Sequence, residues 1–193
     1  MSNIVKFIIG VDIDSTINNL MDKTIEMYNQ LYGTSYTVDD CTDYDFNQCF
    51  PVEVANNIKE LFKSKDIWDS LTPVKNSQWA LKKFIDSGYE IYLTTATDPI
   101  NFSWKCDWVK WYFSFIPESN IIRINNKGLL NVDILIDDCA EQLISNIRCH
   151  RVCIDKPWNQ SIWDEAYGIH RCSNWNEIFE VVNKIFEEEC DIN

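Results

Sequence analysis

Two carboxylates spaced two residues apart, Asp12 and Asp14, follow an apolar run and are followed by small hydroxyl residues. The run, residues 4–11, is typical of a strand buried on both faces of a sheet. Carboxylates at the carboxyl end of such a strand lie where open α/β sheets bind ligands. Because a buried carboxylate is costly without a partner, the pair indicates a cation site or acid–base chemistry. An acidic cap on the following helix is the structural alternative.

Further polar residues recur at the ends of later predicted strands. Thr94 and Thr95 end one strand, Asp137 and Asp138 end another, and Lys127 lies between them. If the strands are parallel neighbours, these groups converge on one crevice with the first pair. Crowded carboxylates favour a hard divalent cation, and Mg²⁺ combines one or two carboxylates with waters and phosphate oxygens. The lysine and the hydroxyls are donors suited to a phosphoryl group, and a carboxylate nucleophile would pass through an aspartyl-phosphate.

Each of these motifs also has a structural explanation of its own. Asp137 and Asp138 fit an acidic turn before a helix, and threonine is at home in strands. Lys127 precedes Gly128, as solvated turn residues often do. These explanations would have to hold together at every strand end and in a fixed order, so the pattern favours an enzyme.

The elements that must position these groups alternate between helix and strand. Apolar residues at helical spacing predict helices at 19–32, 52–64, 77–86, 102–113, 141–147 and 173–188. Short apolar runs predict strands at 4–11, 89–93, 121–124, 134–136 and 152–154. Such alternation predicts an α/β fold built from right-handed βαβ units, with a mainly parallel sheet and helices on both faces.

The segment after the first strand departs from this alternation. Residues 37–51 are rich in Asp, Thr and Asn with interspersed aromatic residues, which is typical of an irregular functional loop. Residues 68–74 are expected to return in an extended conformation. We therefore expect a small helical cap at residues 20–72, inserted over the first strand's carboxyl end, and a core formed by residues 1–19 and 73–193.

The composition limits the partners of this chain. Its formal net charge of −13 over 193 residues argues against a nucleic-acid polymer or an anionic membrane surface. No apolar run approaches the roughly 18 residues that cross a bilayer. The eight cysteines are scattered, form no CxxC pair and follow no signal-peptide pattern. We expect a cytoplasmic protein with reduced cysteines, and the oligomeric state stays open, a homodimer included.

The motifs DxDxT, a strand-ending Thr, Lys and Asp-Asp, in this order, resemble the haloacid dehalogenase (HAD) superfamily of aspartate-dependent phosphatases. The chain is more closely similar to the 5′(3′)-deoxyribonucleotidase family, whose members carry a small helical cap after the first strand. The matching stretches are VDIDSTINN, DIWDSLTPVKNS, YEIYLTTA, KCDWVKWYF, NNKGLLNVDILIDD, DKPWNQ and SNWNEI. The resemblance implies a Rossmann-like HAD core and covers nearly the whole chain.

The resemblance also implies roles for the acidic residues. Asp12 would be the nucleophile that attacks the phosphate. Asp14 would protonate the leaving nucleoside oxygen and then, as a base, activate water. Mg²⁺ would be held by Asp12, the backbone carbonyl of Asp14 and Asp138, with Asp137 nearby beside the substrate.

The same resemblance assigns Thr94 and Thr95 to phosphate binding, and Lys127 to neutralising developing charge and keeping the nucleophile ionised. Two positions depart from the family pattern. Asn125 stands where members carry an Arg, two residues before the motif lysine, and Leu20 stands where they carry an aromatic residue. Recognition of the phosphate, sugar and base is therefore open at these positions.

The leading hypothesis is a Mg²⁺-dependent phosphomonoesterase acting on nucleoside 5′- or 3′-monophosphates. Tyr44, Phe46 and Trp68 are candidates for stacking on a base, with cap packing as the alternative role. There are two other hypotheses: a HAD phosphatase that acts on another small phosphate ester, and a non-catalytic HAD-fold binding protein. A signalling receiver domain uses similar residues, but their order differs and it has no room for such an insertion.

Overall fold

The computed structural model describes residues 7–161 and 164–192. Its strands are β1 (Ile8–Asp12), β2 (Glu90–Thr95), β3 (Ile121–Arg123), β4 (Ile134–Asp137), β5 (His150–Ile154) and β6 (Ile169–Cys172). They form one sheet in the order β3-β2-β1-β4-β5-β6, and every neighbouring pair is parallel. The predicted α/β class with a parallel sheet is confirmed. β1 and β4 are central neighbours, so their carboxyl ends open side by side.

The helices are α1 (Leu20–Tyr32), α2 (Phe46–Cys49), α3 (Val52–Leu61), α4 (Lys65–Ser70), α5 (Ser77–Asp86), α6 (Pro99–Tyr112), α7 (Ala140–Ser145), α8 (Asp164–Tyr167) and α9 (Trp175–Ile192). The α1 helix ends at Gly33, whose φ of 65° is the left-handed conformation that only glycine adopts without cost. Among the described residues, no helix is long and apolar enough to cross a membrane.

Alternation along β4 shows how the sheet is covered on both faces. Ile134 and Ile136 belong to the main apolar cluster together with Ile178 and Val182 of α9. Leu135, between them, instead packs in a second cluster with α7. Because successive strand residues point to opposite faces, α9 and α7 lie on opposite sides of the sheet. A strand enclosed in this way is apolar throughout, as the sequence indicated.

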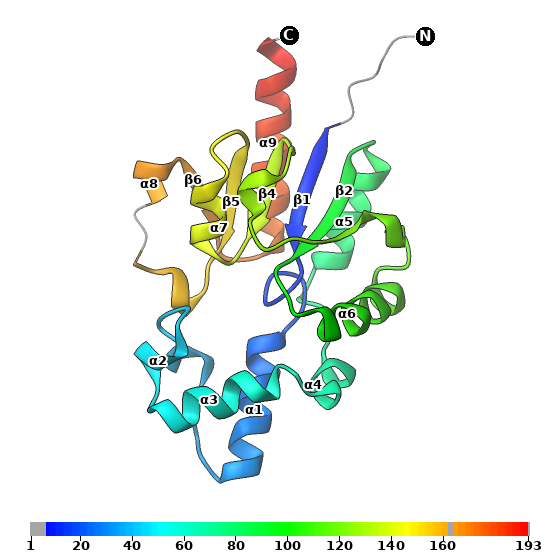
Figure 1. Ribbon diagram of the computed structural model, residues 1–193. Helices are drawn as coiled ribbons and strands as arrows, with labels where there is room; N and C mark the ends of the chain where they lie inside the picture. Colours follow the sequence, from blue (N-terminus) through cyan, green and yellow to red (C-terminus); the bar gives the residue numbers. More distant parts are fainter. Residues whose placement is uncertain (1–6, 162–163, 193) are drawn as a thin grey trace.

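The helices α1 to α4 form the insertion that follows β1, and they lie across the carboxyl ends of the strands (Figure 1). Both connections of the insertion run side by side: the N–H of Asn19 donates to the carbonyl of Thr72 at 3.2 Å. The N–H of Val74 donates to the carbonyl of Ile17 at 2.9 Å. The insertion packs in an apolar cluster that is separate from the main one and consists of Met21, Ile25, Tyr28, Cys41, Phe46, Phe50, Ala55, Ile58 and, from the turn after β5, Trp158.

The structure differs from the predicted elements in four places. Residues 65–70 form the helix α4, whereas residues 68–74 were expected to be extended. The edge strand β6 and the short helices α2 and α8 were not predicted. The predicted strand at 4–11 is confirmed from Ile8 onward, and its residues 4–6 lie outside the described part of the chain.

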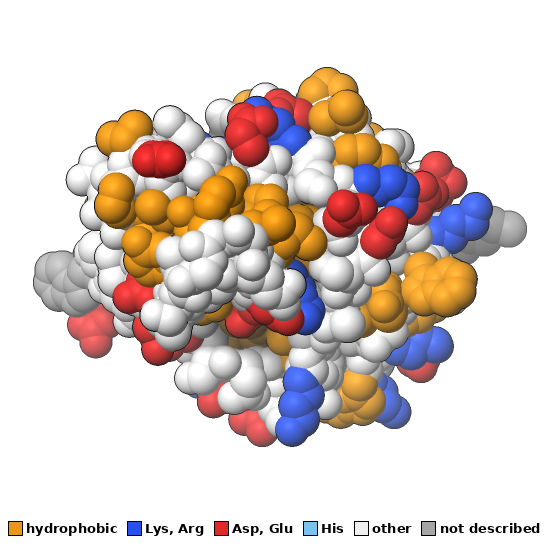
Figure 2. Space-filling view, turned by 90° about the horizontal axis from the view of Figure 1, so that it is seen from below, with side chains coloured by type: hydrophobic (Ala, Val, Ile, Leu, Met, Phe, Trp, Pro, Cys, Tyr) orange, Lys and Arg blue, Asp and Glu red, His pale blue; other side chains and the backbone are white. Residues whose placement is uncertain are grey.

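The end of the molecule that is formed by the insertion carries mixed side chains rather than a basic surface. Figure 2 shows acidic, basic and hydrophobic groups interspersed on this face. Leu31, Tyr32 and Val52 of the insertion are exposed. On the face seen there, charge gives no support for binding a polyanion, in keeping with the net charge. The eight cysteines are free thiols.

Candidate active site

Three carboxylates meet where β1 and β4 end. Val11 pairs with Ile136 in the sheet register, so Asp12 and Asp137 leave the two strands side by side. Asp12, Asp137 and Asp138 are buried, and each offers an oxygen that lies within 4.8 Å of the others. The parallel topology thus brings together two motifs that are more than a hundred residues apart in the sequence.

Lys127 is the cation inside this cluster. Its ammonium donates to Oδ1 of Asp12 and, at 2.6 Å, to Oδ2 of Asp137, and the residue is only 1% exposed. The loop that carries it is held by α7, because the Lys127 N–H donates to Oε1 of Gln142 at 2.9 Å. A Cβ at Gly128 would lie 2.6 Å from the Ser145 carbonyl, so glycine is required at this close approach.

The crowding changes the protonation behaviour of the cluster. Burial raises the pKa of the Asp12 carboxyl to about 7, against the opposing charge of Lys127 and with the help of Asp137. Burial and the charges of Asp12 and Asp137 hold the pKa of Asp138 well above its usual range. Burial alone would lower the pKa of Lys127, but the two carboxylates it contacts outweigh this and raise it. The lysine is therefore charged, and its single positive charge does not fully offset the negative charges of the three carboxylates.

The composition of the cluster fits a hard divalent cation. Its donors are all carboxylate oxygens, the ligands that Mg²⁺ and Ca²⁺ prefer. The buried or half-buried charged groups at these strand ends are four carboxylates, including Asp14, and the two ammonium groups of Lys105 and Lys127. The half-buried Lys156 also acts on Asp138, and burial still raises the pKa of Asp12 and Asp138. A divalent cation bound here would favour the ionised form of both carboxyls.

Asp14 lies beside this cluster, on the turn that follows β1. The turn is tight: Ser15 has a φ of 56°, and its N–H donates to Oδ1 of Asn18 at 2.9 Å. The Asn18 amide also reaches Oδ1 of Asp14, at 3.5 Å. Oδ2 of Asp14 accepts from the ammonium of Lys105 and from the Thr95 hydroxyl, the latter at 3.4 Å. The second predicted carboxylate is therefore held by side chains from three segments of the chain.

Both predicted strand-end threonines are fully buried beside the carboxylates. Thr94 is the register partner of Asp12, and its hydroxyl donates to the carbonyl of Val11 at 3.4 Å. Thr95 contacts Asp14 and Lys105 through its hydroxyl. In this structure the threonine hydroxyls are thus engaged with the protein beneath the site.

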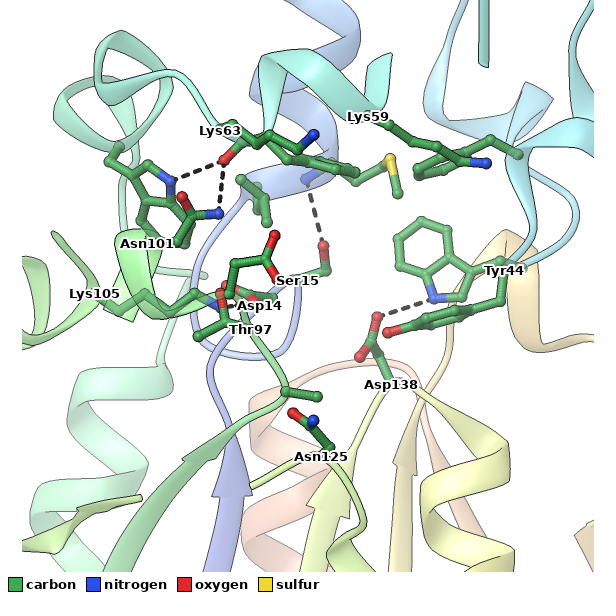
Figure 3. A pocket seen from close by; sticks show the side chains of 18 of the residues that line it. Asp14, Ser15, Tyr44, Lys59, Lys63, Thr97, Asn101, Lys105, Asn125 and Asp138 are labelled. Carbon is green, nitrogen blue, oxygen red and sulfur yellow. Dashed lines mark hydrogen bonds and ion pairs between the residues drawn. The ribbon is translucent and has the colours of Figure 1, made fainter. Parts of the chain in front are cut away.

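A pocket of about 470 Å³ opens above the strand ends, between the core and the insertion (Figure 3). The pocket wall contains all three aromatic candidates, Tyr44, Phe46 and Trp68, and also both departing positions, Leu20 and Asn125. The other lining residues are Asp14, Ser15, Met21, Asp43, Lys59, Phe62, Lys63, Ala96, Thr97, Asp98, Asn101, Lys105, Arg123, Asp138 and Trp158. The volume and aromatic content suit a small molecule with an apolar part.

The aromatic candidates differ in how free they are. Trp68 is buried and its indole N–H donates to the Phe62 carbonyl at 3.2 Å. Phe46 is buried against Phe62, with ring centres 5.6 Å apart. Tyr44 is 52% exposed and points its hydroxyl toward Asp138 in Figure 3. The charge of Asp138 raises the pKa of Tyr44 well above its usual value.

The structure adds residues that the sequence did not single out. Trp158 donates from its indole N–H to Oδ2 of Asp138 at 2.9 Å, the dashed line beside Asp138 in Figure 3. Lys105 of α6 reaches Asp14 from the other side of the pocket. Arg123, at the end of β3, lines the pocket near Asn125 and donates to the Thr97 carbonyl at 3.0 Å. Two signals were available for Lys105: the family-matching stretch KCDWVKWYF begins with it, and it is a lysine among the aromatic residues of α6.

A parallel sheet with a helical insertion over paired strand-end carboxylates is the architecture that this chain shares with solved hydrolases of the HAD superfamily. Solved structures agree on the fold. A haloacid dehalogenase-like hydrolase from Streptococcus pneumoniae superposes with a TM-score of 0.63 at 15% identity, covering 92% of this chain and 98% of the other. A HAD family hydrolase from Deinococcus radiodurans, solved with bound phosphate and sodium, gives 0.63 at 10% identity, covering 93% and 96%.

Residues 6–186 match the family model described as 5′ nucleotidase, deoxy (pyrimidine), cytosolic type C protein (NT5C). The chain belongs to this family. It is 30% identical over 153 residues to a 5′(3′)-deoxyribonucleotidase of Clostridium acetobutylicum, which covers 79% of this chain and 84% of the relative. It is 28% identical over 175 residues to a 5′(3′)-deoxyribonucleotidase of Bacillus subtilis, covering 90% and 96%. The expected family is confirmed.

Proposed function

We propose that this chain hydrolyses (deoxy)nucleoside 5′- or 3′-monophosphates to nucleoside and phosphate through an aspartyl-phosphate, with Mg²⁺ as cofactor. The observation that carries the proposal is the position of Asp12. It is 5% exposed, paired with Lys127, and lies in a carboxylate cluster next to a pocket large enough for a nucleotide. Membership of a nucleotidase family supports the substrate class.

The reaction divides between the two carboxylates of the first motif. An oxygen of Asp12 forms a bond to phosphorus while the bond to the nucleoside oxygen breaks, and Asp14 supplies the proton that this oxygen needs. Asp14 then takes a proton from water as the water attacks phosphorus and releases Asp12. Lys127 keeps the nucleophile in place and offsets its charge.

Asp12, Asp138 and the backbone carbonyl of Asp14 are the proposed Mg²⁺ ligands. Asp137 is engaged by Lys127 and by the Cys139 N–H, at 2.9 Å, so we assign it to positioning the lysine beside the phosphate. Bound there, Mg²⁺ would neutralise phosphate charge and polarise the phosphoryl group. The buried oxygen donors and their excess of negative charge support this ion, whose identity is part of the proposal.

The nucleoside would lie in the pocket under the insertion. Tyr44 is the most accessible of the three aromatic candidates for stacking on the base. Phe46 and Trp68 would form an apolar part of the pocket wall. Thr94 and Thr95 would contribute to the phosphate site through small rearrangements of their hydroxyls. We propose that residues 20–72 act as the cap domain, since their two connections pair at Asn19 and Thr72. The cytosolic description of the family supports a cytoplasmic location.

Phosphate release from a substrate panel tests the proposal. The panel contains dUMP, dTMP, dGMP, UMP, 3′-dUMP, phosphoglycolate and a sugar phosphate, each with Mg²⁺ and with EDTA. We expect metal-dependent release that favours the nucleotides. Release from the non-nucleotides alone would keep the chemistry and replace the substrate class. No release from any ester would instead favour a HAD-fold binding protein.

A further inference from the structure

Lys105 is a buried lysine whose ammonium contacts residues of the candidate active site. Its ammonium donates to Oδ2 of Asp14 and, at 2.6 Å, to the Thr95 hydroxyl, and it lies 5.1 Å from the ring centre of Trp68. The residue is 1% exposed. Burying an ammonium is costly unless a carboxylate compensates it, so the position of Lys105 is explained by Asp14.

The contacts on Asp14 are divided unevenly between its two oxygens. Oδ2 receives both the Lys105 ammonium and the Thr95 hydroxyl. Among the described residues, Oδ1 receives one long contact, from the Asn18 amide at 3.5 Å. Asp14 lines the pocket and its side chain is 25% exposed. Oδ1 is therefore the oxygen that remains free to exchange a proton with a bound molecule.

We propose that Lys105 is a positioning residue for the proton transfers made by Asp14. It holds the carboxyl group by Oδ2, from the side of the pocket opposite Asp138, and so turns Oδ1 toward the leaving-group oxygen. This inference rests on the proposed function, because it assigns a role within the same reaction. Lys105 belongs neither to the strand-end motifs nor to the carboxylate cluster of Asp12, Asp137 and Asp138.

The proton balance of the reaction explains why a cation belongs at this place. When the bond from phosphorus to the nucleoside oxygen breaks, the proton moves from Asp14 to that oxygen, and Asp14 becomes a carboxylate. The ammonium of Lys105 then compensates the new negative charge at hydrogen-bond distance. When water attacks the aspartyl-phosphate, its proton returns to Asp14. Lys105 keeps its own proton throughout.

The first test compares two esters that differ in their need for an acid. A nucleoside leaves as an alkoxide and needs a proton, whereas p-nitrophenolate leaves without one. Since kcat/KM reports only the steps up to departure of the leaving group, we measure it for dUMP and for p-nitrophenyl phosphate. We expect Lys105→Met to lower it about tenfold or more for dUMP, and less than about threefold for the aryl ester.

Lys110→Met is the matched control, since it makes the same change at an exposed position of the same helix. It should leave kcat/KM of both esters within about twofold of the wild type. Asp14→Asn should reproduce the selective loss on dUMP. An equal loss on both esters in Lys105→Met would overturn the inference, because a general structural defect does not distinguish leaving groups.

A double-mutant cycle is a second test of whether Lys105 acts through Asp14, and it needs only the rates with dUMP. If Lys105 acts through Asp14, adding Lys105→Met to Asp14→Asn should lower the residual rate less than about threefold. The double variant removes both charges, so it keeps the comparison available if thermal unfolding shows that Lys105→Met alone is misfolded. Full additivity of the two losses would contradict the inference. A wild-type enzyme that releases no phosphate would instead overturn the proposed function itself.

Discussion

The indole N–H of Trp158 donates a 2.9 Å hydrogen bond to Oδ2 of Asp138, so a cap-packing residue contacts a proposed metal ligand. Trp158 lies in a 3₁₀ turn, Pro157–Asn159, that follows β5, yet its ring packs in the apolar core of the insertion with Met21 and Phe46. The next residue, Asn159, donates to the Asp138 carbonyl at 2.9 Å. Asp138 is thus oriented from both its side chain and its backbone.

Trp158→Phe keeps an aromatic ring in this apolar cluster and removes the indole N–H that orients Asp138, together with part of the ring. We expect the Kd for Mg²⁺ to rise about 10- to 100-fold, as for other groups that orient metal ligands. Isothermal titration with Mg²⁺ measures it. Trp108→Phe is the matched control, because Trp108 donates to the Leu71 carbonyl, away from the carboxylates. Equal Mg²⁺ affinities in both variants would contradict the role of Trp158.

Asp12→Asn should abolish turnover while leaving Mg²⁺-dependent stabilisation and substrate binding partly intact. The amide cannot act as the nucleophile, and losing covalent catalysis costs far more than a hundredfold in rate. Single-turnover phosphate release from dUMP checks this. A variant that retains more than about a hundredth of the wild-type rate would show that Asp12 is not the nucleophile.

Lys127→Met should be strongly destabilising, because it leaves Asp12 and Asp137 buried without their shared cation. Breaking a buried ion pair on one side costs about 3–5 kcal/mol in free energy of unfolding. Urea unfolding measures this cost, and saturating Mg²⁺ should recover part of it. Lys82→Met, at an exposed pair with Asp86, should change the free energy by less than about 0.5 kcal/mol. Similar losses in both variants would refute the assignment.

The carboxylate cluster could be predicted because each of its members ends a strand. A buried strand is a strong local signal, and parallel topology then decides where its end lies. Asp12 and Thr94 are register partners, although they are 82 positions apart in the sequence. The convergence of Asp12, Lys127 and Asp137 followed from the same rule.

Lys105 and Trp158 could not be predicted in this way, because their partners are set by packing rather than by position on a strand. Lys105 lies on α6, where aromatic residues at helical spacing indicated only core packing. Its contact with Asp14 depends on how α6 is placed over the sheet. Trp158 meets Asp138 because the chain after β5 returns across the end of β4, and 20 residues separate the two.

The missed elements are short or have polar centres. β6 has four residues, and its middle two, His170 and Arg171, are polar. Polar residues are common on an edge strand, and β6 lies at the edge of the sheet. The helix α4 spans six residues, too few for a helical period to stand out. Its Ile67 and Trp68 are buried, so tertiary packing stabilises it rather than local propensity.

Mg²⁺ binding should weaken as the pH falls below about 7. In the metal-free protein, burial raises the pKa of Asp12 from 3.8 to about 7, so between these values the folded state holds a proton that the unfolded state has lost. The free energy of unfolding therefore falls as the pH rises through this window, and Mg²⁺ must displace the proton in order to bind. For one proton, the affinity at pH 6 should be about tenfold lower than at pH 8. Titration calorimetry in buffers of different ionisation enthalpy checks both the affinity and the proton release. Asp12→Asn should remove most of the dependence, and an equal Kd at both pH values in the wild type would show that Asp12 is already ionised before the metal binds.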